Sequence, residues 1–125
     1  MSGPTLNLEE LLKAVAAVNA WLDGDMSPEY AAQPLAHTWA RITKVCEEAG
    51  EVWRALSKWT GENPRKGVCG TSEDVLGELG DTAAGAIFAI QHITGDTAAT
   101  WAVFSAAVAK AHSRAVAAGV RGGTQ

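Results

Sequence analysis

Apolar residues recur every three or four positions along this chain, which is the spacing of one face of an α-helix. The first such stretch covers residues 6–23, and its apolar positions are Leu8, Leu11, Leu12, Val15, Val18 and Leu22. The same periodicity predicts helices over about residues 34–60, 72–94 and 97–118. No stretch alternates apolar and polar residues as a strand does. We therefore predict an all-α domain with four main helices, a four-helix bundle-like fold.

Turn-forming residues separate the four stretches. A glycine follows each of them, where helices commonly end: Gly24, Gly61, Gly95 and Gly119. Ser27 followed by Pro28 predicts a short turn of helix, because serine caps helices and proline fits the first helical position. The main loop is expected at residues 61–72, "GENPRKGVCGTS". We expect Asn7 or Thr5 to cap the first helix and Thr71 or Ser72 to cap the third.

The length and composition of the chain suit one small domain. The chain has 125 residues, of which 47% are apolar, so we predict one domain over 1–125 with a core of about 6–118 and a flexible tail at 119–125. The net charge of −4 argues against nucleic acid as a partner. No signal peptide or membrane-length apolar run is visible, and two cysteines do not make a disulfide framework. These features predict a cytoplasmic protein without a membrane partner.

Two pairs of acidic residues lie three positions apart on successive predicted helices. Glu48 and Glu51 form one pair, and Glu78 and Asp81 form the other. Residues at this spacing share one helix face, and both pairs border the apolar stripe of their helix. If the two helices pack as an antiparallel hairpin, the four carboxylates face one another. Oxygen ligands on rigid helices suit Mg²⁺, with Mn²⁺ as a possible substitute.

The alternative interpretation is that these acids only solvate a helix face. A single acidic pair is usually of that kind. Here Glu47 adds a like charge four positions before Glu51, a spacing that destabilises a helix by about 0.2–0.5 kcal/mol. Two pairs on successive helices, with this repulsion retained, favour a cation site over solvation.

The acidic motifs also carry a resemblance to a known family. "EEAGE" at 47–51, followed by "ELGD" at 78–81, is similar to the EExxE and ExxD motifs of the MazG-like all-α nucleotide pyrophosphohydrolases. The similarity covers about residues 35–95. It implies Mg²⁺-dependent hydrolysis of nucleoside triphosphates to the monophosphate and pyrophosphate, by an enzyme that forms homodimers or homotetramers.

The resemblance also implies roles for individual acids. Glu48, Glu51, Glu78 and Asp81 would be the metal ligands. Glu47 and Glu48 would be catalytic, with Glu47 orienting or deprotonating the attacking water. The physical interpretation agrees, since a divalent cation bridges phosphate oxygens and lowers the pKa of a bound water.

A triphosphate also needs cationic partners. Lys44, Arg54 and Lys58 are predicted near the carboxylate side of the second main helix, and Arg65 and Lys66 lie in the loop after it. We expect these five residues to contact substrate phosphates. For the three helical residues, pairing with glutamates of the same helix is the alternative.

Aromatic residues are the candidates for contacting the base. The chain has five tryptophans, which by default belong to the core or to a subunit interface. We expect Trp39 and Trp59, which flank the acidic helix, to stack on the base and His37 to contact it. Cys46 is predicted to be a core residue and Cys69 a loop thiol.

Two other functions remain open. A phosphoribosyl-ATP pyrophosphatase-like enzyme would share the architecture. A non-enzymatic helical interaction module would use its acids for solubility or partner recognition. The chain has no GxxxxGK[ST] motif for a phosphate-binding loop and no ExxH pattern for a di-iron site.

Overall fold

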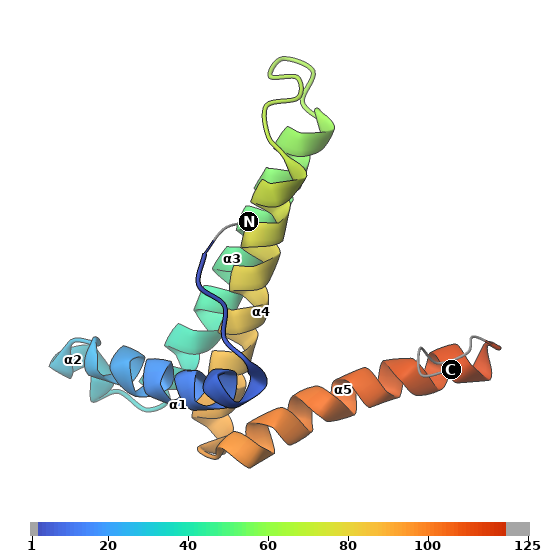
Figure 1. Ribbon diagram of the computed structural model, residues 1–125. Coiled ribbons are helices and arrows are strands. Elements are labelled where there is room, and N and C mark those ends of the chain that lie inside the picture. The colour runs from blue at the N-terminus through green and yellow to red at the C-terminus, as the bar shows by residue number, and fades with distance from the viewer. Residues whose placement is uncertain (1–2, 120–125) are drawn as a thin grey trace.

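The structure is a computed structural model, and it describes residues 3–119 (Figure 1). Five helices follow one another along the chain: α1 (Leu8–Gly24), α2 (Pro28–Ala31), α3 (Ala36–Thr60), α4 (Ser72–Thr94) and α5 (Thr97–Ala117). No strand occurs in that part of the chain. The predicted all-α class is confirmed, and the predicted helix limits agree with the observed ones to within about two residues. Residues 120–125, most of the predicted tail, lie outside the described residues.

Side chains at the predicted positions start most of the helices. The Asn7 side chain accepts from the Glu10 backbone N–H at 2.9 Å, and the Glu10 carboxylate accepts from the Asn7 backbone N–H at 3.0 Å. Thr71 and Asp74 form the same reciprocal capping box at the start of α4. α3 differs, because its cap residue, Leu35, has φ 60° and makes no side-chain hydrogen bond. The start of α3 is therefore held by packing rather than by a capping side chain.

Helices α3 and α4 form a long antiparallel hairpin (Figure 1). The Cys69 backbone N–H donates to the Lys58 carbonyl at 3.0 Å, which ties the returning loop to the end of α3. Gly70 lies so close to α3 that an added Cβ would stand 2.9 Å from Lys58 Cβ. Further along, a Cβ on Gly85 would meet Val45 Cγ2 at 3.6 Å. Small residues on α4 and in the loop before it thus set both the closeness and the register of the two helices.

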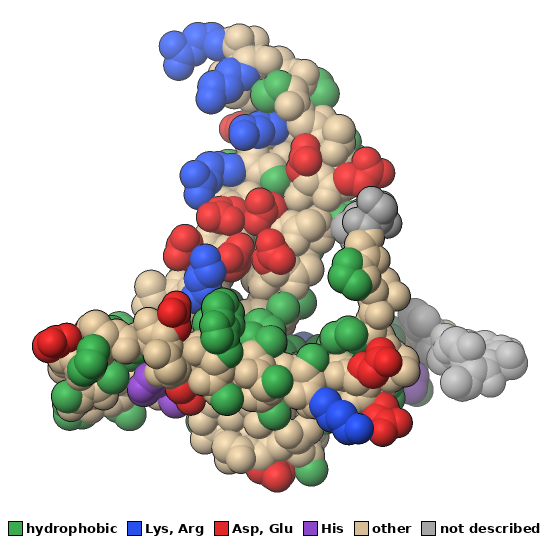
Figure 2. Space-filling model, turned by 60° about the vertical axis from the view of Figure 1, so that its left-hand side comes forward, with side chains coloured by type: hydrophobic (Ala, Val, Ile, Leu, Met, Phe, Trp, Pro, Cys, Tyr) green, Lys and Arg blue, Asp and Glu red, His purple; other side chains and the backbone are tan. Residues whose placement is uncertain are grey.

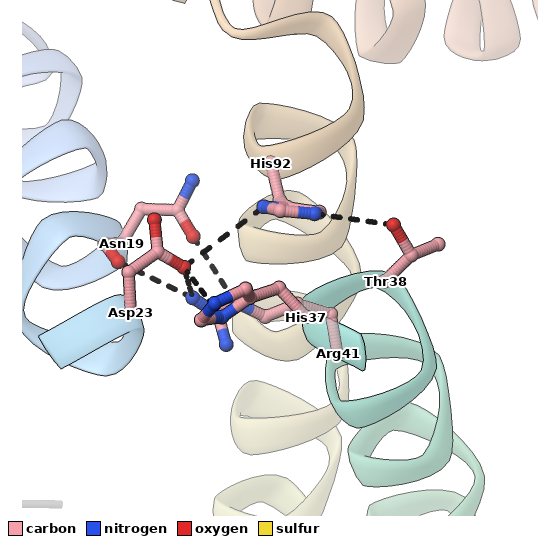
Figure 3. A network of polar contacts seen from close by, with 6 residues as sticks. All are labelled: Asn19, Asp23, His37, Thr38, Arg41 and His92. Carbon is pink, nitrogen blue, oxygen red and sulfur yellow. Dashed lines mark hydrogen bonds and ion pairs between the residues drawn. The ribbon is translucent and has the colours of Figure 1, made fainter. Parts of the chain in front are cut away.

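Polar contacts join α1 to the base of the hairpin (Figure 3). The buried Arg41 side chain donates to Asn19 Oδ1 at 3.0 Å and to the Asn19 backbone oxygen at 3.2 Å. It also pairs with the Asp23 carboxylate, which lies 3.3 Å from His37 Nδ1. Because a buried guanidinium is stable only when its donors are satisfied, this network determines where α1 crosses the hairpin.

Helix α5 leaves the base of the hairpin and points away from it (Figure 1). The buried apolar side chains of the described residues are few and mostly small: Val15, Ala36, Ala55, Val75 and Ala89. The structure therefore confirms the all-α class, whereas the more specific prediction of a four-helix bundle stays a prediction. None of the helices described is both long and apolar enough to cross a membrane.

One prediction about burial was wrong, and a second holds only in part. Cys46 was expected in the core but is exposed. Four of the five tryptophans are exposed in the single chain, Trp21, Trp39, Trp53 and Trp59. They do not belong to its core, and the alternative of a subunit interface stays a prediction. Helical periodicity places a residue on a face, but which faces are covered depends on how the helices are arranged.

Candidate functional site

The register of the hairpin brings the two acidic pairs together. Because Lys58 lies against Gly70 and Val45 against Gly85, residues in the middle of α3 lie level with the middle of α4. Carboxylate oxygens of Glu48, Glu78 and Asp81 all lie within 4.8 Å of one another. Figure 2 shows acidic side chains gathered on this middle part of the hairpin. The predicted meeting of the two pairs is therefore observed for three of the four residues.

Two oxygens of this acidic cluster (Glu48, Glu78 and Asp81) are buried without a partner. Glu48 is only 8% exposed. Its Oε2 atom and Oε2 of Glu78 have no hydrogen-bond partner among the described residues. Buried polar atoms are nearly always satisfied, so two orphaned carboxylate oxygens at one place require an explanation. A cation bound between them provides one, since it replaces the missing donors.

Glu51 lies beside the cluster, although its carboxylate is outside the group within 4.8 Å. The charge of Glu48, then burial and the contact with Glu78, raise the pKa of Glu51 above its ordinary value. The carboxylates of Glu48, Glu51 and Glu78 are therefore close enough to repel one another. Such repulsion is relieved when a proton or a cation is bound.

Lys44 holds the two neighbouring glutamates of α3. Its Nζ lies 2.9 Å from Glu48 Oε1 and 3.6 Å from Glu47 Oε1. The hydrogen bond from Lys44 lowers the pKa of Glu48, and the same contact raises the pKa of Lys44. The pairing within one helix that was the alternative for Lys44 is therefore observed. Its effect is to favour the ionised form of the Glu48 carboxylate.

A polar cleft of about 500 Å³ opens next to the cluster, toward the tip of the hairpin. Glu51 and Glu78 line its acidic side, and Arg54 and Lys58 contribute cationic side chains. Arg54 is only 4.0 Å from Glu51, whereas Lys58 has no ion pair among the described residues. Figure 2 shows Lys and Arg side chains gathered along this part of the hairpin, beyond the acids. Negative and positive groups thus follow one another along a single cleft.

Of the two basic residues in the loop after α3, one lies near this cationic region. Lys66 lines a smaller pocket of about 150 Å³ together with Arg54 and Lys58. Arg65 lines neither of these two clefts, although its backbone N–H donates to Asn63 Oδ1 at 3.1 Å. Of the two loop residues predicted to contact phosphates, Lys66 is therefore close to the cleft.

A second, mostly apolar cleft of about 300 Å³ lies on the opposite side of Lys44 from the polar one. Leu22 and Met26, from α1 and the segment after it, face Phe88 of α4 across this cleft. Lys44 and Arg41 also line it. The acidic cluster therefore stands between the apolar cleft and the polar cleft.

The three residues predicted to contact a base lie elsewhere. At 1.5 Å of rise per residue, His37 and Trp39 are about 16 and 13 Å along α3 from Glu48. Trp59 lies about 12 Å from Glu51 in the other direction. Trp39 lines a small pocket with Leu35 instead, and His37 belongs to the Asp23 network. Within one chain, none of the three reaches the clefts beside the cluster.

Sequence reasoning missed the apolar cleft and Arg41. The cleft combines α1, α3 and α4, so periodicity within one helix could not reveal it. Arg41 did leave a signal, because it stands seven positions before Glu48 and therefore on the same helix face. A basic residue on the inward face of an otherwise apolar stripe indicates a buried polar network.

Comparison with known proteins found no match among protein-family models, curated proteins or solved structures. The resemblance of the two acidic motifs to the MazG-like family is therefore still a prediction.

Proposed function

We propose that this protein binds Mg²⁺ and hydrolyses nucleoside triphosphates to the monophosphate and pyrophosphate. The observation that carries the proposal is the set of three carboxylates within 4.8 Å, two of them with a buried, unpartnered oxygen in the described part of the chain. Acids that only solvate a helix face are exposed, whereas these two oxygens are buried.

The donor set fits a hard divalent cation. Glu48, Glu78 and Asp81 would hold it, with Glu51 as the fourth carboxylate beside them. Mg²⁺ prefers carboxylate oxygens and tends to keep positions for water and phosphate, and Mn²⁺ accepts the same ligands. Bound there, the cation supplies charge neutralisation to phosphate oxygens and lowers the pKa of water.

The two clefts support one orientation of the substrate. Arg54 and Lys58 would bind the outer phosphates in the polar cleft, since guanidinium and ammonium groups form strong hydrogen bonds with phosphate. The base and sugar would occupy the apolar cleft formed by Leu22, Met26 and Phe88. The bond between the inner two phosphates then lies over the acidic cluster. Breaking that bond releases pyrophosphate toward the cationic end.

The chain's own residues position the reaction. Lys44 holds the Glu48 carboxylate ionised through its 2.9 Å contact. Glu47, 3.6 Å from the same ammonium, is the remaining acid at this point of α3 and would orient or deprotonate the water. Fixing the water and the phosphate in line accounts for a large part of such catalysis.

The test measures pyrophosphate release from a panel of ribo- and deoxynucleoside triphosphates with Mg²⁺. We expect release by the wild-type chain, and a loss of at least about a hundredfold for Glu48→Gln and for Asp81→Asn. Glu73→Gln is the matched control, because Glu73 is an acid in the first turn of α4, away from the cluster.

Melting with and without Mg²⁺ separates metal binding from catalysis. We expect Mg²⁺ to raise the melting temperature of the wild type and of Glu73→Gln, but not of Glu48→Gln. If no nucleotide yields pyrophosphate above the Glu48→Gln background, the proposed enzyme activity is wrong. Absence of a Mg²⁺ effect on melting would refute the cation site as well.

A further inference from the structure

A small pocket near the tip of the α3–α4 hairpin continues the polar cleft. This tip pocket has a volume of about 150 Å³, and it shares Arg54, Lys58 and Cys69 with the cleft. The residues that line the tip pocket alone are Trp53, Ser57, Asn63, Lys66 and Gly67. In the described part of the chain, acids line only the polar cleft of the two, and they are Glu51, Asp74 and Glu78. The lining thus changes from acidic beside the cluster to cationic at the tip.

Trp53 exposes a ring face at the tip pocket. The residue is 60% exposed. The aromatic ring pairs of the described residues join His37 with His92 and Trp101 with Phe104, so the Trp53 indole has no aromatic partner there. Any nucleobase stacks well on such a ring, because every base has a π-face. An exposed indole beside cations is therefore suited to a nucleoside that carries phosphates.

The loop after α3 is folded so that Lys66 lies at this pocket. The backbone N–H groups of Lys66 and Gly67 donate to the Asn63 carbonyl at 3.1 and 3.0 Å, respectively. The Asn63 side chain accepts in turn from the Arg65 backbone N–H at 3.1 Å. Gly67 has φ 63°, a conformation that glycine adopts without strain. These contacts hold the loop against α3, and the cation of Lys66 is added to those of the helix.

A nucleoside triphosphate leaves two features of the tip without a partner. In the orientation proposed above, it has two phosphates beyond the bond that breaks, and Arg54 and Lys58 suffice to bind them. Lys66 is a third cation, and Trp53 lies beside it. Neither Lys58 nor Lys66 forms an ion pair among the described residues. A substrate with three phosphates beyond that bond, followed by a second nucleoside, has a partner for each of these groups.

We propose that the tip pocket binds the second nucleoside of a dinucleoside polyphosphate, with its base stacked on Trp53 and the adjoining phosphate bound by Lys66. The first nucleoside occupies the apolar cleft, as in the proposed hydrolysis of triphosphates, on which this inference rests. The substrates of the site then include dinucleoside tetraphosphates as well as nucleoside triphosphates.

Water cleaves the dinucleoside tetraphosphate at the first phosphate. The water oxygen forms a bond to that phosphorus, and the bond from the phosphorus to the bridging oxygen breaks. The electron pair of the broken bond leaves on the nucleoside triphosphate, while a proton of the water passes to Glu47 and on to solvent. The products are one nucleoside monophosphate and one nucleoside triphosphate, without pyrophosphate.

The test compares two substrates with the same base, the triphosphate that the wild type hydrolyses best and the matching dinucleoside tetraphosphate. Initial rates of monophosphate release give kcat/KM for each, before the triphosphate product is itself consumed. We expect Trp53→Ala to lower the ratio of the tetraphosphate's kcat/KM to the triphosphate's by about five- to a hundredfold, the effect of removing an aromatic ring that stacks on a base. Trp21→Ala is the matched control and should leave the ratio unchanged, because Trp21 is 66% exposed on α1 and lines neither cleft nor the tip pocket.

Lys66→Gln is a second variant, which tests the same pocket without removing a tryptophan. It should lower the same ratio, because only the tetraphosphate places a phosphate at Lys66. Lys13→Gln should not change the ratio, since Lys13 lies on α1, where it pairs with Glu9.

Hydrolysis of the triphosphate without hydrolysis of the dinucleoside tetraphosphate would overturn this inference and leave the proposed function intact. So would a ratio that is the same in Trp53→Ala and in Trp21→Ala. If neither substrate is cleaved, the proposed function is wrong, and calorimetric titration with Mg²⁺ tests the tip pocket by itself. Diadenosine tetraphosphate should then bind more tightly than ATP to the wild type but not to Trp53→Ala, and equal affinity of the wild type for both would refute the pocket.

Discussion

Glu51 is the acid whose ionisation in the folded chain is opposed by its neighbours. The charge of Glu48, then burial and Glu78, raise its pKa above the ordinary value of 4.5. The folded state therefore holds the proton to a higher pH than the unfolded state does. As pH rises from about 4.5 through the raised pKa, this carboxyl costs the folded state stability.

Glu51→Gln removes this penalty and should raise the melting temperature of the metal-free protein at about pH 7. The advantage should disappear below about pH 4, where Glu51 is protonated in both states. Circular dichroism melts in EDTA across this pH range measure it. A Glu51→Gln protein less stable than wild type at neutral pH would show that the carboxylate is not under repulsion.

Lys58 is the cation of the polar cleft that has no carboxylate partner in the described part of the chain. If it binds an outer phosphate, Lys58→Gln removes a charge-assisted hydrogen bond worth about 1.5–3 kcal/mol. KM for the triphosphate should then rise about ten- to a hundredfold, since each 1.4 kcal/mol is about tenfold. Lys13→Gln is the control, because Lys13 is exposed on α1, where it pairs with Glu9. An unchanged KM for Lys58→Gln would contradict the proposed orientation.

At the scale of elements, the α3–α4 hairpin is the frame of the candidate site. Its loop returns at Gly61, which has φ 71° and stands where a Cβ would lie 2.8 Å from Val68 Cγ2. Gly50, in the middle of α3, has no other atom within 4 Å of a Cβ position. The first glycine is required by the turn, while the second only lowers helix propensity.

The two glycines should respond oppositely to alanine. Gly61→Ala should lower the free energy of unfolding by about 1–2 kcal/mol, because an alanine is strained at this φ. Gly50→Ala should raise it by about 0.5–1 kcal/mol. Urea denaturation of both variants checks the pair. Equal effects would indicate that the loop does not hold the conformation described above.

At the scale of the whole molecule, α5 carries exposed apolar residues, among them Phe104 and Val108. The resemblance to the MazG-like family implies a homodimer or homotetramer. If two copies form a dimer through the exposed face of α5, the melting temperature of the wild type should rise with protein concentration, by mass action. Val108→Glu places a charge on this exposed face. The melting temperature of Val108→Glu should be constant. Scanning calorimetry between about 5 and 200 µM checks this, a range over which mass action is measurable. A wild-type melting temperature independent of concentration contradicts the dimer.

The carboxylates illustrate how far sequence reaches into the site. A spacing of three residues is enough to place Glu48 with Glu51, and Glu78 with Asp81, on one face of their helices. It could not show that Glu48, Glu78 and Asp81 form the closest group while Glu51 lies beside them. That depends on the rotation of each helix in the hairpin, which contacts such as Gly70 against Lys58 decide.

The sequence by itself determined the helices, because periodicity, capping residues and glycines act locally and need no tertiary partner. It also determined which acids could act together, since helix geometry is regular. Only the tertiary structure decided the apolar cleft, the burial of Arg41 and the exposure of α5 and of the tryptophans. These depend on the angles at which helices cross, and those angles are the result of packing between residues far apart in the chain.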